Sequence, residues 1–201
     1  DINNIAFGFM ASKAIFAALH IDLFTLLSHK ALNIKQISAS LKVPSNRITI
    51  LLRALKGLNL VTLKGGLYFS AQCAQVFLTR GSRLEFIDYL KYQIDLQMYP
   101  FLNQLNDAID GKLDNKSIES YQHWMSDPDR AALYSNAQHS GSLVPGSALA
   151  KLISLSNAKT ILDIGGGTGA ITIKLLERFP KLFSTIIDFP NVAEIGWGFI
   201  S

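Results

Sequence analysis

A strand that runs directly into a cluster of glycines constrains the fold of this chain most. Residues 160–164 form an apolar, partly β-branched run, and residues 170–179 have the pattern of an amphipathic helix that ends at Pro180. A second apolar run follows at 183–187. Between the first run and the helix stand Gly165, Gly166, Gly167 and Gly169. This order of elements is half of a Rossmann-type parallel sheet, so we predict that an α/β domain occupies residues 159–201.

The glycines predict a ligand site, because a ligand can lie against a backbone without side chains and glycine readily adopts the dihedral angles of such a turn. The first amides of the following helix would face its polar atoms. Asp188 ends the second strand about 20 residues beyond the first glycine, where a carboxylate can accept hydrogen bonds from both hydroxyls of an adenosine ribose.

Asp163 distinguishes between adenosine-containing ligands. Gly165, Gly167 and Ala170 formally satisfy the dinucleotide pattern G-x-G-x-x-A. A carboxylate two residues before the first glycine, however, would face the anionic pyrophosphate of NAD unfavourably. It suits a ligand that carries a sulfonium and an ammonium group. The alternative is that Asp163 merely ends a strand facing solvent.

The segment 34–71 has the pattern helix, turn, helix and hairpin, which is typical of a winged helix. The two short strands, Leu60–Leu63 and Leu67–Ser70, are joined across Lys64-Gly65-Gly66. A winged helix can bind DNA, but the second helix is mostly apolar and its cations are scattered. The net charge of +4 is also mild. A structural or dimerising use is therefore the favoured interpretation, and we expect no nucleic-acid partner.

The most apolar segment, residues 5–27, is long enough to span a membrane. Lys13, His20 and Asp22 interrupt it, and charges within a span are costly in lipid. We interpret it as helices, broken around 19–22, that are buried in a core or between subunits. Apolar residues make up 49% of the chain and charged ones 17%, which also favours buried surface against a partner. The single cysteine, Cys73, fits a reducing, cytoplasmic location, and we expect no membrane partner.

Between these parts, residues 84–110 and 117–155 are expected to be helical, and the polar, turn-rich residues 110–116 are expected to form an exposed loop. Aromatic residues crowd the first of these helical stretches, and at helical spacing they form either a core or, less commonly, a substrate pocket. Asp127-Pro128 starts a further helix, with the aspartate as N-cap and the proline at the first position. Val144-Pro145-Gly146 predicts a break in it. We assign residues 1–100 to the first domain and 101–158 to helices that link the two domains and line a cavity.

The sequence Leu162-Asp163-Ile164-Gly165-Gly166-Gly167-Thr168-Gly169 resembles the first motif of class I S-adenosylmethionine methyltransferases. Together with Asp188-Phe189-Pro190, it is similar to the two-domain O-methyltransferases of plants and bacteria, which act on caffeic acid, acetylserotonin, carotenoid and polyketide hydroxyls. The resemblance covers essentially the whole chain. It implies a mainly α winged-helix domain that interlocks two subunits into a homodimer, followed by the start of a Rossmann-like methyltransferase domain.

The same resemblance implies the site. Its cofactor would be S-adenosyl-L-methionine, without a metal, and its second substrate a small hydroxylated metabolite, aromatic or polyene. The residues implied for the cofactor are Asp163, Gly165, Gly166, Gly167, Gly169 and Asp188. The segment 134–142, which is similar to a polar cluster of the family, would line the cofactor or substrate cavity through Tyr134, His139 and Ser140.

The catalytic histidine of the family acts as general base and follows the glycine loop, whereas His20, His29, His123 and His139 all precede it. We therefore expect no catalytic base among these residues, a base beyond Ser201, and no turnover by residues 1–201 alone. Two alternatives remain open at this point. The chain could be a non-catalytic dimerisation module with a vestigial cofactor loop, or a winged-helix regulator that binds DNA.

Overall fold

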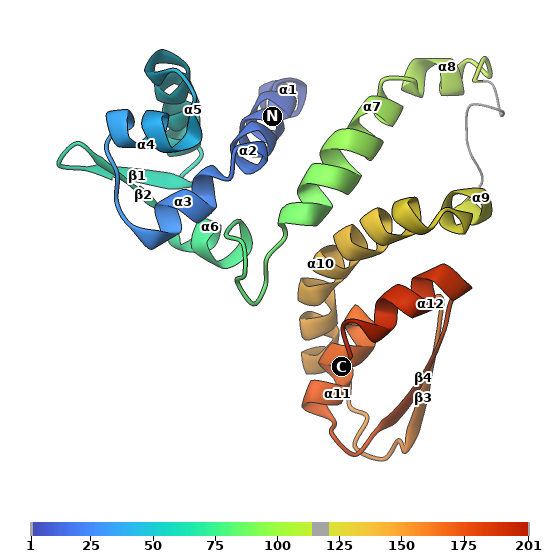
Figure 1. The fold of residues 1–201 in the computed structure, drawn as a ribbon. Helices are drawn as coiled ribbons and strands as arrows, with labels where there is room; N and C mark the ends of the chain where they lie inside the picture. Colours follow the sequence, from blue (N-terminus) through green and yellow to red (C-terminus); the bar gives the residue numbers. More distant parts are fainter. Residues whose placement is uncertain (1, 114–120, 201) are drawn as a thin grey trace. The chain divides into compact units, whose positions relative to one another are not determined.

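The structure is a computed structural model that describes residues 2–113 and 121–200. It consists of two compact units, residues 1–87 and residues 88–201, and each is considered by itself (Figure 1).

The first unit is helical with one hairpin. Its helices are α1 (Ile2–Ala6), α2 (Gly8–His20), α3 (Leu23–His29), α4 (Ile34–Leu41), α5 (Ser45–Gly57) and α6 (Gln72–Phe77). Strands β1 (Val61–Lys64) and β2 (Leu67–Ser70) pair antiparallel. The predicted helix, turn, helix and hairpin are therefore present in this order. The predicted break after α2 is confirmed at Asp22, whose φ of 52° is left-handed.

Apolar spacing explains the core of the first unit. Ile37 of α4 is fully buried, and so are Ile48, Leu52 and Leu55 of α5, which recur at the four- and three-residue intervals that bring side chains to one helix face. An Asn33–Gln36 capping box starts α4, in which each side chain bonds the other residue's backbone N–H. Helix α4 packs against α5, and α5 packs against β1 of the hairpin.

The first helices differ from the sequence-based expectation. Only Phe16, Ala18 and Leu19 of α2 are buried, and α1 buries no residue. Of the two predicted alternatives, burial in the core therefore does not hold for the first part of this segment within the described residues of the first unit, which leaves burial between subunits as the prediction. By length and composition alone, Ile2–His20 is long and apolar enough to cross a membrane. A single helix of this kind is weak evidence for a membrane span, because core helices and signal sequences meet the same criteria.

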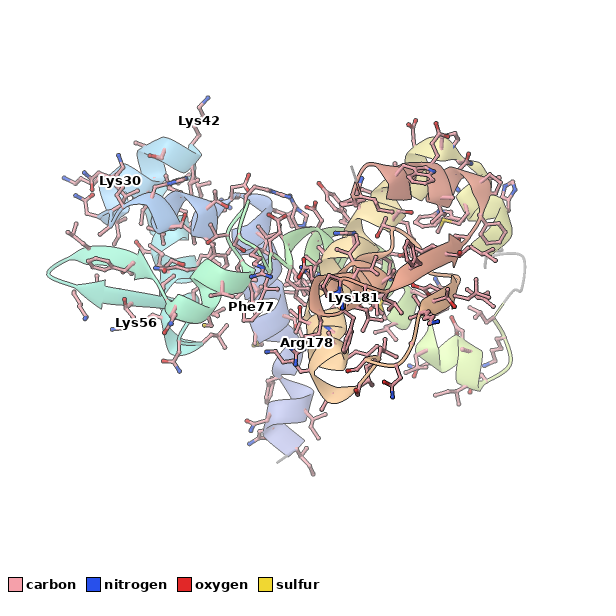
Figure 2. All side chains as sticks on the ribbon, turned by 90° about the horizontal axis from the view of Figure 1, so that it is seen from below. Lys30, Lys42, Lys56, Phe77, Arg178 and Lys181 are labelled. Atoms are coloured by element: carbon pink, nitrogen blue, oxygen red, sulfur yellow. The ribbon has the colours of Figure 1, made fainter. Side chains whose placement is uncertain are left out.

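The cations of the first unit are spread over its surface. Figure 2 shows Lys42, which follows α4, and Lys56, on α5, on opposite sides of this unit. Both side chains are exposed. These two lysines therefore do not belong to one continuous basic surface of the kind that binds DNA.

The second unit is arranged around one long helix. Its elements before the sheet are the π-helix η1 (Tyr89–Met98), α7 (Tyr99–Leu102), α8 (Leu105–Ile109), α9 (Tyr121–Ser126) and α10 (Pro128–Leu152). After these come β3 (Thr160–Ile164), α11 (Ala170–Arg178), β4 (Phe183–Ile187) and α12 (Pro190–Trp197). Helix α10 packs against η1, α11 and α12.

The beginning of α10 is as predicted, but its continuation is not. The Asp127 side chain accepts hydrogen bonds from the amides of Asp129 and Arg130, and Pro128 is the first helical residue. The predicted break at 144–146 is wrong, because the helix runs unbroken through Pro145. Gly146 is buried where a Cβ would lie 3.0 Å from the backbone of Ile171. Close packing of α10 on α11 at this glycine outweighs the cost of the proline.

Strands β3 and β4 form the predicted parallel pair, with Thr160 opposite Phe183 and Ile164 opposite Ile187. Alternate residues face opposite sides of the sheet. Asp163 and Ile186 lie on the half-buried side, whereas Ile164 and Phe183 are exposed on the other. The carboxyl ends of both strands therefore meet at one edge, where the glycine loop begins.

Candidate functional site

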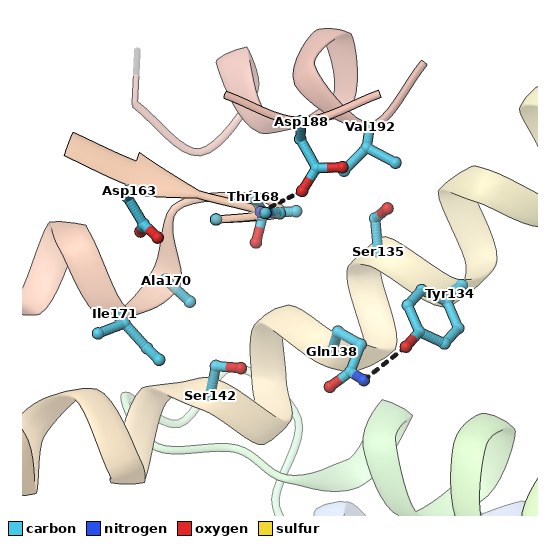
Figure 3. A pocket seen from close by; sticks show the side chains of 13 residues that line it. Tyr134, Ser135, Gln138, Ser142, Asp163, Thr168, Ala170, Ile171, Asp188 and Val192 are labelled. Atoms are coloured by element: carbon cyan, nitrogen blue, oxygen red, sulfur yellow. Dashed lines mark hydrogen bonds between the residues drawn. The ribbon is translucent and has the colours of Figure 1, made fainter. Parts of the chain in front are cut away.

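A cavity of about 270 Å³ lies between the glycine loop and α10 (Figure 3). The loop side consists of Asp163, Gly165, Gly166, Gly167 and Thr168, with Asp188 at the end of β4. Helix α10 contributes Tyr134, Ser135, Gln138 and Ser142 on the facing side. Of the six residues predicted to bind a cofactor, five line this cavity, and Gly169 begins α11 behind it.

Glycine is required in the loop for two different reasons. Gly165 and Gly167 have φ angles of 72° and 61°, which side chains rarely adopt, and the position of a Cβ at either residue is open space. A Cβ at Gly166 would instead lie 2.6 Å from the Asp163 carboxyl carbon. Gly165 and Gly167 thus keep a cavity open, and Gly166 lets the loop lie closely over the strand.

Asp188, at the end of β4, hydrogen-bonds the glycine loop that follows β3. Its Oδ2 accepts a hydrogen bond from the Gly167 N–H at 2.7 Å, and its Oδ1 accepts one from the Phe189 N–H at 2.7 Å. An ionised carboxylate has about four acceptor positions, so about two remain for a ligand. The side chain is half-buried and lines the cavity, where it can accept hydrogen bonds from a pair of hydroxyl groups.

Asp163 lies under the loop and not at a solvent-facing strand end. It is half-buried, and its Oδ2 accepts a hydrogen bond from the Thr172 hydroxyl at 2.6 Å. Thr172 is itself buried in α11. This bond holds the carboxylate at the edge of the cavity, where its negative charge favours a cationic ligand over an anionic one.

Helix α10 supplies Ser135 and Gln138, which lie in the predicted cavity-lining segment 134–142 but which the sequence pattern does not single out as site residues. The Ser135 hydroxyl is buried and has no hydrogen-bond partner among the described residues, although it borders the cavity. Gln138 donates to the Tyr134 hydroxyl at 2.9 Å, as Figure 3 shows. An orphaned buried hydroxyl is costly unless a ligand or water satisfies it, so Ser135 is a candidate ligand contact. Its spacing from Asp127 gave no signal of this role.

The other two residues predicted to line the cavity lie elsewhere, which corrects that expectation. The Ser140 hydroxyl accepts the Tyr89 N–H and donates to the Ala137 carbonyl, so it joins α10 to η1. His139 hydrogen-bonds the Thr168 hydroxyl at 2.8 Å and stacks on Phe199 with ring centroids 3.7 Å apart. Ser140 thus points toward η1, whereas His139 contacts Thr168 of the glycine loop without itself lining the cavity.

His139 is neutral at physiological pH. Its burial, and then the positive charge of Lys174, lower its pKa from 6.5 to about 4. Lys174 is itself buried and pairs with Glu177 at 2.7 Å. A neutral imidazole nitrogen can either accept a hydrogen bond from the Thr168 hydroxyl or donate one to its oxygen, depending on the tautomer. In both cases this contact holds the glycine loop against α10.

This lowered pKa predicts how stability depends on pH. Between about pH 6.5 and 4 the unfolded chain binds a proton at His139 that the folded chain does not, so stability falls as the pH is lowered through this window. His139→Gln keeps a hydrogen-bonding group for Thr168 but cannot titrate. We expect its melting temperature to fall less than that of the unsubstituted protein. His29→Gln, at an exposed position, should follow the unsubstituted protein, and three parallel curves would contradict the assignment.

Two family models match the chain. Residues 3–80 match an O-methyltransferase dimerisation domain, and residues 103–200 match an O-methyltransferase domain. Among curated relatives, a 3-hydroxy-5-methyl-1-naphthoate 3-O-methyltransferase of Streptomyces sahachiroi is 23% identical over 195 residues, which is 96% of this chain and 56% of the relative. An acetylserotonin O-methyltransferase of Macaca mulatta is 27% identical over 209 residues, 96% of this chain and 59% of the relative. The chain thus spans little more than half the length of these two relatives.

Solved structures have the same fold. Human N-acetylserotonin methyltransferase in complex with SAM superposes with a TM-score of 0.85 at 23% identity, over 100% of this chain and 61% of that one. CalO1, a methyltransferase of calicheamicin biosynthesis in its SAH-bound form, gives a TM-score of 0.81 at 18% identity, over 96% of this chain and 59% of that one.

Proposed function

Because this chain belongs to the family of class I S-adenosylmethionine-dependent O-methyltransferases, we propose that the cavity of Figure 3 binds S-adenosyl-L-methionine. The enzyme would transfer a methyl group to a hydroxyl of a small metabolite. One observation carries this proposal: Gly165 and Gly167 leave open space between the carboxylates of Asp163 and Asp188. When bound, the cofactor supplies the activated methyl group.

The chemistry of the lining residues fits this cofactor. Asp188 would accept hydrogen bonds from the ribose hydroxyls, and Gly165 and Gly167 would lie along the methionine part. Asp163 would contribute negative charge near the cationic groups, with Gly166 allowing the close approach of the loop. Gly169 would position the first turn of α11. Ser135 would give its unsatisfied hydroxyl to a polar atom of the ligand, and Tyr134 would border it.

An aromatic or polyene acceptor is the proposed substrate class. The names of the similar proteins support it, since they include a hydroxynaphthoate, an acetylserotonin and a demethylspheroidene O-methyltransferase. The loop residues of this chain would hold the donor, and the catalytic base is not assigned to any of its four histidines.

Calorimetric titration with S-adenosylhomocysteine and with NAD⁺ tests the cofactor. In the parent enzyme we expect the first to bind and the second not to bind, because Asp163 would lie close to the pyrophosphate of NAD⁺, whereas residues 1–201 alone are predicted to bind weakly or not at all. Binding of NAD⁺ alone would reject the proposal. Transfer of a labelled methyl group to a panel of phenols then separates an enzyme from a non-catalytic module, which would bind the cofactor without transfer. Residues 1–201 expressed alone remain predicted to show no turnover.

The proposed organisation is a winged-helix dimerisation domain over residues 1–100, linking and cavity-lining helices over 101–158, and part of a Rossmann-like domain over 159–201. The exposed apolar residues of α1 and α2 support a homodimer formed through these helices. A cytoplasmic location, and the absence of nucleic acid, membrane and metal from its partners, stay predictions.

A further inference from the structure

A second cavity in the same unit has an apolar, aromatic wall. Its volume is about 190 Å³, and η1, α9 and α10 form it. Tyr92 of η1, Trp124 of α9 and Tyr134 of α10 contribute rings to this wall. Ring faces and edges of this kind contact flat apolar molecules favourably.

Gln93 is the unusual member of this wall. Its side chain is only 9% exposed, and its Oε1 has no hydrogen-bond partner among the described residues. A buried amide oxygen without a partner destabilises the folded protein, so a ligand or water that donates to it would be stabilising here. It lies within a π-helix, a conformation frequent at functional sites. An acceptor in an aromatic cavity selects a flat ligand that donates a hydrogen bond.

Tyr134 connects this cavity to the cofactor site. It lines both cavities, and its hydroxyl accepts the hydrogen bond from Gln138, which lines the first cavity. Its ring also meets Trp124 edge to face, with centroids 5.3 Å apart. A molecule in the aromatic cavity would therefore lie next to the glycine-loop cavity, with Tyr134 bordering both.

We propose that the cavity between η1, α9 and α10 holds the aromatic part of the methyl acceptor, and that Gln93 Oε1 accepts a hydrogen bond from a donor group on it. This inference rests on the proposed function. A volume of about 190 Å³ is below the usual size of a pocket for a whole drug-sized ligand, so it fits one small ring system. Gln93 is then a specificity-determining residue that distinguishes hydroxylated rings from rings without a donor.

Two probes of similar size and shape test this role. Binding of 2-naphthol and of 2-methylnaphthalene is measured by calorimetry in the unsubstituted protein saturated with S-adenosylhomocysteine, and in Gln93→Leu. We expect the substitution to weaken 2-naphthol binding about tenfold and to change 2-methylnaphthalene binding less than twofold. Gln104→Leu, at an exposed position of the same unit, should change neither. Equal binding of the two probes by the unsubstituted protein, or an equal loss for both in Gln93→Leu, would overturn the proposal.

Two further measurements separate the possible failures. The melting temperature of ligand-free Gln93→Leu should not fall, because the substitution removes an unsatisfied buried group; a fall would show that the protein itself holds Gln93 and would overturn its role. Titration with S-adenosylhomocysteine tests the proposed function independently. Cofactor binding without 2-naphthol binding rejects only the acceptor cavity, whereas 2-naphthol binding without cofactor binding rejects the proposed function.

Discussion

Replacing Asp188 with alanine is expected to weaken S-adenosylhomocysteine binding at least tenfold, about 1.4 kcal/mol. The substitution removes the acceptors proposed for the ribose hydroxyls. It also removes the partner of the Gly167 N–H, so the loop loses the bond that holds it over the strand ends. Both effects act on the cofactor side of the cavity. Isothermal titration of the purified variant measures the change.

Asp188→Asn separates the two effects. An asparagine can still accept the Gly167 N–H, but it has no negative charge and only one acceptor oxygen. We expect its melting temperature to stay close to that of the unsubstituted protein while its affinity remains reduced. Asp110→Ala serves as the control, because the Asp110 side chain forms an exposed ion pair with Lys112 and such pairs contribute little. Unchanged affinity in Asp188→Ala would disprove the ribose assignment.

The loop and its strands could be predicted because their signals are local. A β-branched run, glycines that must adopt positive φ, and an acidic residue at the end of the next strand determine β3, the loop and β4 without distant contacts. Asp163 and Asp188 reach the same cavity because carboxyl ends of parallel strands meet at one edge. Helix α12, directly after Asp188, was not predicted; its Val192 is buried against Met125 and Ala131, which are distant in sequence.

The remainder of the site depends on tertiary packing. Pro145 predicted a helix break, yet α10 continues because Gly146 permits contact with α11. The rotation of this helix then decides that Ser135 and Gln138 line the cavity, whereas His139 bonds to Thr168 of the loop outside it and Ser140 bonds to Tyr89 and Ala137. A sequence window that marks 134–142 as a polar cluster cannot show which residues of it reach the cavity.

The second large effect is expected at the N-terminal helices. Ile2 and Ile5 are each 81% exposed, and Phe9 is 50% exposed, although all three are large apolar residues. This surface lies in the domain that matches a dimerisation family, and the proposed homodimer would cover it with a second copy of the chain. Burying one such side chain contributes roughly 1.5–3 kcal/mol. The double variant Ile5→Glu/Phe9→Glu should therefore raise the dimer dissociation constant more than about 100-fold, and analytical ultracentrifugation over a concentration series measures it.

The control for this prediction is Ile109→Glu, which changes an equally apolar side chain that is 74% exposed but lies on α8 of the other unit. It should leave the dimer intact, because no dimer contact is proposed there. Circular dichroism must accompany both measurements, since a dimer can be required for the folded state of each subunit. A folded double variant that sediments as the unsubstituted dimer would remove α1 and α2 from the interface. If the unsubstituted protein itself is monomeric, the proposed homodimer through α1 and α2 is wrong.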